Sequence, residues 1–489
     1  AGQRLLSTVI AQRPGSSGAA GIVILAHRDA TAAGSPSGLS GTAVLLELAR
    51  VLASRETART ITLVSTSGGS GGDAGVQDFT AQVPRPLDGA IVLGDLTSSS
   101  GREPSVVSYS DGLGGAPLAL TATVAHALAA QFGPEPPTPG LAAQFAHLAF
   151  PLAVGEQAPL DEQGIAAVLV GAGGEGASAS SAAGGSVQIE NSGRAVLSAI
   201  DALDGGGEVG APQSELLLGR DTIPPWAIRL LVGALMLPLL LVAIDALARV
   251  RRRRERTGRW VLWVLSCALP FLLCVVLAIL LGLAGVGASP PAPVAARAAP
   301  LDGSAWSMLI ALAAVFTSVW FWRPVLLARL DVSEPPTTAA AAVAVLLVLV
   351  ICSVVVWVAN PFAAALLVFA LHPWLLLISP ELRPGRWLGF ALLLFGLLPC
   401  LLLVLYYASA LGAGPVEALW IAVLMLTGGH LGILAGLLAS ILCGAILALA
   451  LIVVRGRLHT TAPVRVSIRG PITYAGPGSL GGTESALHR

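Results

Sequence analysis

The chain has 489 residues, of which 55% are hydrophobic and only 11% are charged, and its formal net charge is zero. Balanced charge without a basic aromatic face argues against nucleic acid as a partner. All five cysteines follow residue 266, so no disulfide can stabilise the first half of the chain. Acidic side chains concentrate before residue 222 and long apolar runs follow it, which predicts a soluble domain at 1–222 and a membrane domain at 223–457.

The first half alternates strand and helix patterns. Residues 21–27 are apolar and rich in β-branched side chains, which is typical of a central strand buried on both faces. A looser strand at 5–12 is expected to pair beside it. The remaining segments are strands at 60–66, 90–94 and 165–170, and helices at 40–53, near Phe79, at 117–131 and at 193–203, with Ser40 available as the first N-cap. This alternation predicts a mostly parallel sheet in an α/β three-layer sandwich.

The central strand ends in a histidine and a carboxylate. His27 is its last residue, and Asp29 follows two positions later. Open α/β sheets carry their chemistry at the carboxyl ends of strands, and a metal-binding imidazole usually has a carboxylate that orients its second nitrogen. The pair therefore indicates a candidate metal or polar site, while an ordinary surface position is the alternative.

The order of these segments over residues 5–205 resembles the di-zinc aminopeptidases of peptidase family M28, clan MH. The similarity rests on four segments: Ala26-His27-Arg28-Asp29, Ser40 to Ala49, Gly72-x-x-Gly75 with Phe79, and Leu93-Gly94-Asp95. The resemblance implies the fold of those enzymes. It also implies that His27 and Asp95 are remnants of the metal site and that Asp29 supports His27 from the second shell of ligands.

The same resemblance shows departures at the metal site. The family's bridging Asp falls on Ser37, and its Glu-Glu pair, general base and zinc ligand, falls on Gly69 and Ser70. The family's closing histidine has no counterpart in the sequence. Two protein ligands cannot hold a di-zinc centre, and a carboxylate is needed to deprotonate the attacking water. We therefore predict a catalytically inactive pseudopeptidase without a cofactor, which binds a peptide or protein at the strand-end cleft or serves as a membrane-complex subunit.

Two other functions stay open. An active membrane zinc metallopeptidase of the aminopeptidase type would need relocated ligands, for which Asp73, His126 and His147 are conceivable. A transporter or lipid-handling protein with an accessory soluble domain is the other alternative, and His430 beside a helix break is then the polar group of interest. Metal analysis and ligand-dependent flux distinguish these functions.

The second half contains apolar runs long enough to span a bilayer. Six spans are expected at 226–250, 260–288, 305–322, 338–358, 361–378 and 387–408. A seventh begins near residue 428 after a short re-entrant or interfacial piece, with eight spans as the alternative. Small residues recur every fourth position there and predict a face for close helix packing: Gly428, Gly432, Gly436, Ser440 and Gly444.

Charge next to the first span predicts the orientation in the membrane. Arg251–Arg254 follow that span directly, and the positive-inside rule places them in the cytoplasm. Residues 1–222 are then extracytoplasmic in a multi-pass protein of the cell membrane, with lipid as a partner. Residues 458–489, rich in Gly, Pro and Ser, are predicted to be a disordered cytoplasmic tail. Because an exported domain needs a signal, a signal-anchor helix is expected before the first residue.

Overall fold

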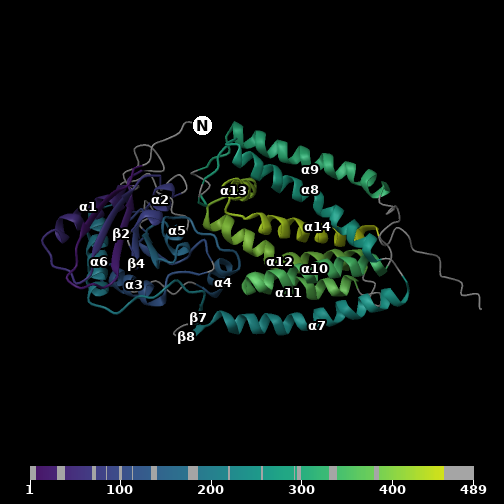
Figure 1. Cartoon of the computed structure of the whole chain (residues 1–489), viewed down its shortest axis with the longest axis horizontal. Coiled ribbons are helices and arrows are strands. Elements are labelled where there is room, and N and C mark those ends of the chain that lie inside the picture. Colours follow the sequence, from purple (N-terminus) through teal and green to yellow (C-terminus); the bar gives the residue numbers. More distant parts are fainter. Residues whose placement is uncertain are drawn as a thin grey trace, which may run out of the picture.

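The computed structural model describes residues 7–29, 39–68, 73–83, 85–97, 102–112, 114–133, 140–174, 185–218, 221–254, 257–290, 292–294, 299–329, 339–378 and 385–455. Figure 1 shows an α/β domain at one end of the molecule and long helices lying side by side at the other. The first of these long helices begins at Pro225, close to residue 222, where the composition of the sequence changes.

A six-stranded sheet forms the centre of the α/β domain. Its strands are β1 (Val9–Arg13), β2 (Gly21–His27), β3 (Ile61–Thr66), β4 (Leu87–Leu93), β5 (Ser105–Val107) and β6 (Ala167–Gly171). The spatial order is β1-β3-β2-β4-β6-β5, with four parallel strands in the middle and antiparallel β1 and β5 at the edges. A mostly parallel sheet is confirmed.

The partner of β1 differs from the prediction. β1 pairs with β3, in register from Val9 opposite Ser65 to Arg13 opposite Ile61, and not with the central strand β2. Both edges of β2 are occupied by parallel strands, β3 and β4. The connection after β1 therefore has to pass over the start of β3, and Ser16 N donates to Thr57 O at 3.0 Å along that path.

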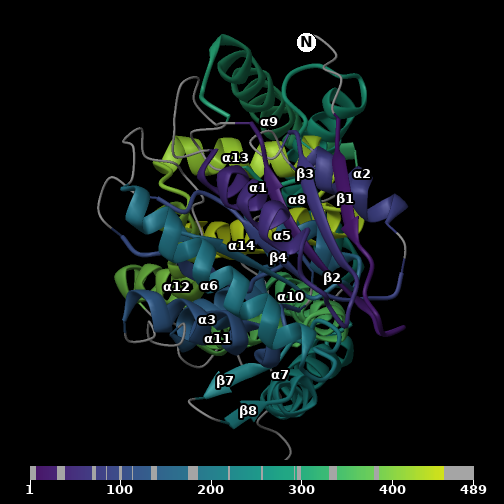
Figure 2. The same ribbon diagram turned by 90° about the vertical axis from the view of Figure 1, so that its left-hand side faces the viewer.

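Helices cover both faces of the sheet, as Figure 2 shows. The helices of this domain are α1 (Ser40–Leu52), α2 (Ala74–Gln82), α3 (Leu118–Phe132), α4 (Leu141–Ala149), α5 (Gln157–Glu162) and α6 (Ser186–Asp204), of which α4 packs against Leu216 and Phe362. Ile22 and Ile24 of β2 pack in one buried cluster with α1, α3 and α6, and Val23 and Leu25 pack in another with α2 and α5. Successive side chains of β2 thus pack against helices on opposite faces of the sheet, as expected of a strand buried on both faces. The three-layer sandwich is therefore confirmed.

Ser40 has a different role from the predicted one. The N-cap position of α1 is Leu39, and no side chain caps the helix. The Ser40 hydroxyl instead accepts a hydrogen bond from the Leu96 amide at 2.8 Å, and Ser40 is 2% exposed. The hydroxyl thus joins the start of α1 to the chain that leaves β4.

Seven helices among the described residues are long and apolar enough to cross a membrane, which indicates a multi-pass membrane protein. They are α7 (Pro225–Arg252), α8 (Thr257–Leu283), α9 (Gly303–Arg329), α10 (Ala339–Ala359), α11 (Pro361–Ile378), α12 (Arg386–Ala410) and α14 (Ile433–Arg455). In the most apolar 18-residue stretch of α10, 61% of the residues are buried inside the protein, whereas the share is 17–44% in the other six helices. α10 is therefore the central helix of the bundle. A two-stranded ribbon, β7 (Leu216–Leu218) and β8 (Asp221–Ile223), precedes α7.

The last apolar segment is divided at a glycine-rich break. α13 (Pro415–Thr427) is short and is seen end-on in Figure 1, so it runs across the long helices, and α14 follows after five residues. A methyl group added at Gly444 would overlap the backbone of Ala268 on α8, and one added at Gly436 would lie 2.7 Å from Val275 Cγ1. A Cβ added at Gly428 would overlap the Pro290 carbonyl oxygen, whereas one added at Gly432 would have no heavy atom within 4 Å. Close packing of α14 on α8 thus depends on Gly436 and Gly444.

Candidate functional site

Two of the sequence-predicted residues meet at the carboxyl edge of the parallel sheet. His27 ends β2, and Asp95 lies two residues beyond the end of β4, the neighbouring parallel strand. His27 is half-buried, and Asp95 is 7% exposed. Because parallel strands end at the same edge, the fold brings both side chains to the place where open α/β sheets carry ligands.

The side chain paired with His27 is Glu156, which the sequence pattern did not single out. Glu156 occupies the N-cap position of α5 and is 2% exposed. Its Oε2 atom lies 3.6 Å from His27 Nδ1, which is an ion-pair distance and too long for a hydrogen bond. Its Oε1 atom accepts a hydrogen bond from the hydroxyl of Thr66, the last residue of β3. A carboxylate from α5 is therefore held against the strand-end histidine.

Three further carboxylates surround this pair. Asp29 Oδ1 accepts a hydrogen bond from Gly68 N at 3.0 Å, which joins the loop after β2 to the end of β3. Asp73, at the N-cap position of α2, is 2% exposed and has a left-handed backbone with φ of 56°. Asp95 Oδ1 and Glu156 Oε2 are buried and receive no hydrogen bond from the described residues. The site is therefore rich in buried acids, with one imidazole among them.

The electrostatic field of these acids shifts the titration of the site. Burial alone would lower the pKa of His27, but the carboxylate of Glu156, followed by those of Asp95 and Asp29, raises it from 6.5 to about 9. Burial and then the charge of Glu156 raise the pKa of Asp73 well above its usual value. Burial also raises the pKa of Asp95, against the effect of His27. At neutral pH the histidine is consequently an imidazolium beside carboxylates.

The described residues at this edge do not form the two-zinc site of the family. A zinc site takes three or four protein ligands. Over the described ranges there is no group of three or more His, Cys, Asp or Glu side chains that could hold a metal ion. Ser37, Gly69 and Ser70 lie outside the described residues, and the stretches 30–38 and 69–72 that contain them have no ligand-type side chain in their sequence. The stretch 175–184, which follows β6, has one, Glu175.

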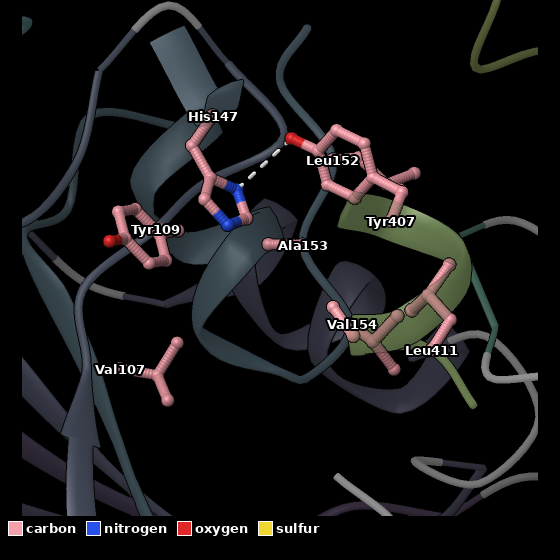
Figure 3. Close-up of a pocket in the computed structure, with 9 residues that line it drawn as sticks. Val107, Tyr109, His147, Leu152, Ala153, Val154, Tyr407 and Leu411 are labelled. Atoms are coloured by element: carbon pink, nitrogen blue, oxygen red, sulfur yellow. Dashed lines mark hydrogen bonds between the residues drawn. The ribbon is translucent and has the colours of Figure 1, made fainter. Parts of the chain in front are cut away.

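The two histidines considered as replacement ligands lie in other surroundings. His126 is exposed on α3. His147, on α4, stacks on Tyr109 with ring centroids 3.7 Å apart, and its Nδ1 atom lies 3.3 Å from the hydroxyl of Tyr407 on α12 (Figure 3). Its Nε2 atom lies 3.3 Å from the hydroxyl of Tyr406, also on α12. His147 is therefore part of the junction between the α/β domain and the helix bundle. Of the three conceivable replacements, Asp73 lies close enough to His27 for their charges to interact.

Comparison with known proteins agrees with this fold. Residues 8–143 match the model of Peptidase family M28. The α/β domain is peptidase family M28-like. Among solved structures, the zinc aminopeptidase of Bacillus subtilis aligns at 15% identity over 40% of this chain and 49% of that one, with a TM-score of 0.32. The aminopeptidase of Aneurinibacillus sp. strain AM-1 aligns at 19% identity over 41% and 49% of the two chains, with the same TM-score of 0.32.

The aligned part spans about half the length of these two aminopeptidases. The search of curated proteins gave no match. An M28-like domain followed by seven apolar helices makes this chain a membrane peptidase-like protein. We refer to residues 7–218 below as the peptidase-like domain.

Proposed function

We propose that this protein is a membrane-anchored pseudopeptidase, which keeps the scaffold of an aminopeptidase but acts in binding or as a subunit of a membrane complex. The observation that carries the proposal is the contact between His27 and Glu156. A histidine that ligates zinc offers a neutral nitrogen to the metal and its other nitrogen to a supporting carboxylate. Here the carboxylate of Glu156 lies beside that histidine and, against the effect of burial, raises its pKa to about 9, which favours an imidazolium with no free nitrogen for a metal ion. Thr66 fixes the second oxygen of Glu156.

The sequence at the loop positions supports the same proposal. The resemblance places the bridging carboxylate at Ser37, and the base and third ligand at Gly69 and Ser70. None of these side chains can ligate zinc in place of a carboxylate or deprotonate a water molecule at neutral pH. Asp73 is the nearest acid in the sequence to Gly69 and Ser70, and burial, followed by the charge of Glu156, raises its pKa well above the usual value.

The chemistry of the strand-end site suits a cationic group. Asp29, Asp95 and Glu156 all act on His27 by their negative charge, and two buried carboxylate oxygens in this set lack a donor among the described residues. A free amino terminus carries three N–H donors and a positive charge, and would satisfy such oxygens. A peptide or protein terminus is therefore the class of ligand that we propose for this edge.

An activity assay tests the loss of hydrolysis. The full-length protein in lipid nanodiscs would be incubated with aminoacyl nitroanilides and short peptides in the presence of Zn²⁺, Co²⁺ or Mn²⁺. We expect no turnover above that of a His27→Ala variant prepared in parallel. Turnover that is abolished in the His27→Ala variant would contradict the proposal.

One observation favours a second function, an active zinc aminopeptidase with relocated ligands. Asp95 Oδ1 and Glu156 Oε2 are buried oxygens without a donor among the described residues, and a metal ion is one partner that would satisfy them. In that case the Glu156→Gln substitution would reduce both metal content and turnover. In a pseudopeptidase it would change neither.

The orientation of the protein is part of the same proposal. Arg251–Arg254 lie at the C-terminal end of α7, and the positive-inside rule assigns that end of the helix to the cytoplasm. The peptidase-like domain, at the opposite end of α7, would then face the outside of the cell membrane. There it would meet extracytoplasmic peptides and proteins.

A further inference from the structure

A seven-residue segment connects the membrane helices to the strand-end site. Residues 150–156, which we call the strap, link α4 to α5 and have the sequence Phe-Pro-Leu-Ala-Val-Gly-Glu. The strap begins at the junction with α12 and ends at Glu156, the residue paired with His27. The strap therefore contacts both the membrane helix α12 and the strand-end site.

The membrane end of the strap is fixed by α12 and α13. The Tyr407 hydroxyl donates a hydrogen bond to the Phe150 carbonyl at 2.6 Å. Leu152 is 4% exposed and packs in one apolar cluster with Tyr407 and Leu411 of the α12 end and with Ile421 of α13. Figure 3 shows Leu152, Ala153 and Val154 passing beside Tyr407 and Leu411. The strap is thus inserted between the domain and the bundle.

His147, at the start of this region, adds a second connection to α12. Because Tyr407 gives its single hydroxyl proton to Phe150 O, the hydroxyl can act only as acceptor toward His147 Nδ1, which lies 3.3 Å away. The other face of the ring stacks on Tyr109, which follows β5. α12 therefore contacts both the carbonyl of the strap and the histidine that precedes it.

The site end of the strap has little freedom. The Ala153 amide donates to Asp111 Oδ1 at 2.7 Å. Gly155 has a φ of +134°, a conformation that L side chains rarely adopt, and a Cβ there would lie 2.5 Å from the Gln157 side chain. Glu156 follows at once and is held by Thr66. Displacement at Leu152 must therefore move Glu156 or break one of these contacts.

We propose that the strap couples the conformation of α12 and α13 to the strand-end site. Movement of α12 relative to the domain would withdraw Glu156 from His27, and a ligand that displaces Glu156 would loosen the packing of Leu152 and Tyr407. This reciprocity is required of any coupling between two sites. The inference does not rest on the loss of hydrolysis, since the strap would transmit the same movement in an active enzyme.

Amide hydrogen exchange of the full-length protein in nanodiscs tests the coupling. Tyr407→Phe removes the hydroxyl that holds Phe150 O and keeps the ring. A neutral hydrogen bond contributes about 1 kcal/mol, so exchange in α5, residues 157–162, is expected to rise about fivefold. Tyr406→Phe is the matched control, because it removes the neighbouring hydroxyl, which lies 3.3 Å from His147 Nε2. Equal exchange of α5 in both variants would overturn the proposal.

The reverse experiment starts at the site and covers the case in which Tyr407→Phe does not fold. Thr66→Val is nearly isosteric and removes the hydroxyl that holds Glu156 Oε1. We expect faster exchange of the Ala153 amide and of the strap, with β1 unchanged. Unchanged exchange in the strap would overturn the proposal, and because the readout is not turnover, this outcome is distinguishable from failure of the proposed function.

Discussion

At the scale of single residues, the site combines features that the sequence could and could not reveal. His27 ends one buried strand and Asp95 lies two residues beyond another, so the sequence pattern alone located both. Glu156 is separated from His27 by 128 residues and precedes a helix of only six residues, so no motif marked it. The available signal was weak: Glu156 is the one acid in the apolar stretch 145–160.

The His27–Glu156 pair predicts a pH dependence of stability. Because the pKa of His27 is raised to about 9 in the folded protein, its contribution is fully present below pH 6.5 and is lost as the pH rises through 9. The loss is at most on the order of 3 kcal/mol. Thermal unfolding of the full-length protein between pH 6.5 and 9.5 measures it. Glu156→Gln should flatten the profile, whereas Glu47→Gln, at an exposed pair with Arg50, should leave it unchanged.

At the scale of elements, the apolar runs in the sequence predicted the central strands, but they did not predict the pairing of β1 or the two short helices α4 and α5. The apolar runs of β2, β3, β4 and β6 are long and uninterrupted, and all four were predicted within a few residues. β1 can pair only with a strand whose other side is not already paired, and which strand that is depends on the order of the whole sheet. α4 and α5 were missed because both are short and apolar, and their burial depends on the helix bundle and on β6.

Glycine substitutions in the last segment test the packing of α14. Gly444→Leu would force side-chain atoms into the backbone of Ala268 on α8, and overpacking of this kind costs about 1–3 kcal/mol. We expect a clear decrease in the thermal unfolding temperature of the purified protein. Gly432→Ala is the matched control, since Gly432 has no heavy atom within 4 Å of an added Cβ. Equal effects of the two substitutions would contradict the packing described here.

At the scale of the whole molecule, the docking of the two parts could not be predicted from the sequence. Asn360 illustrates the reason: its Oδ1 accepts from the amides of Phe362 and Ala363 at the start of α11, and its Nδ2 donates to the Leu148 and Ala149 carbonyls of α4. The first role is local and typical of Asn before a helix. The second joins residues more than 200 positions apart, and no periodicity reports it.

The proposed orientation leads to a labelling experiment in intact cells. In a variant whose five native cysteines are replaced, Ser54→Cys and Arg253→Cys place one thiol on an exposed position of each part of the chain. A membrane-impermeant maleimide should label the cysteine at position 54 and not that at position 253 until the cells are opened. The opposite pattern would place the peptidase-like domain in the cytoplasm.

The central claim is that an internal acid–histidine pair stands where the family holds its metal ions. The most direct measurement is the zinc content of the full-length protein after equilibration with excess zinc and gel filtration, beside His27→Ala and Asp95→Ala variants. We expect the three proteins to retain equal amounts of zinc. One or two zinc ions per chain in the unmodified protein, lost in both variants, would contradict it.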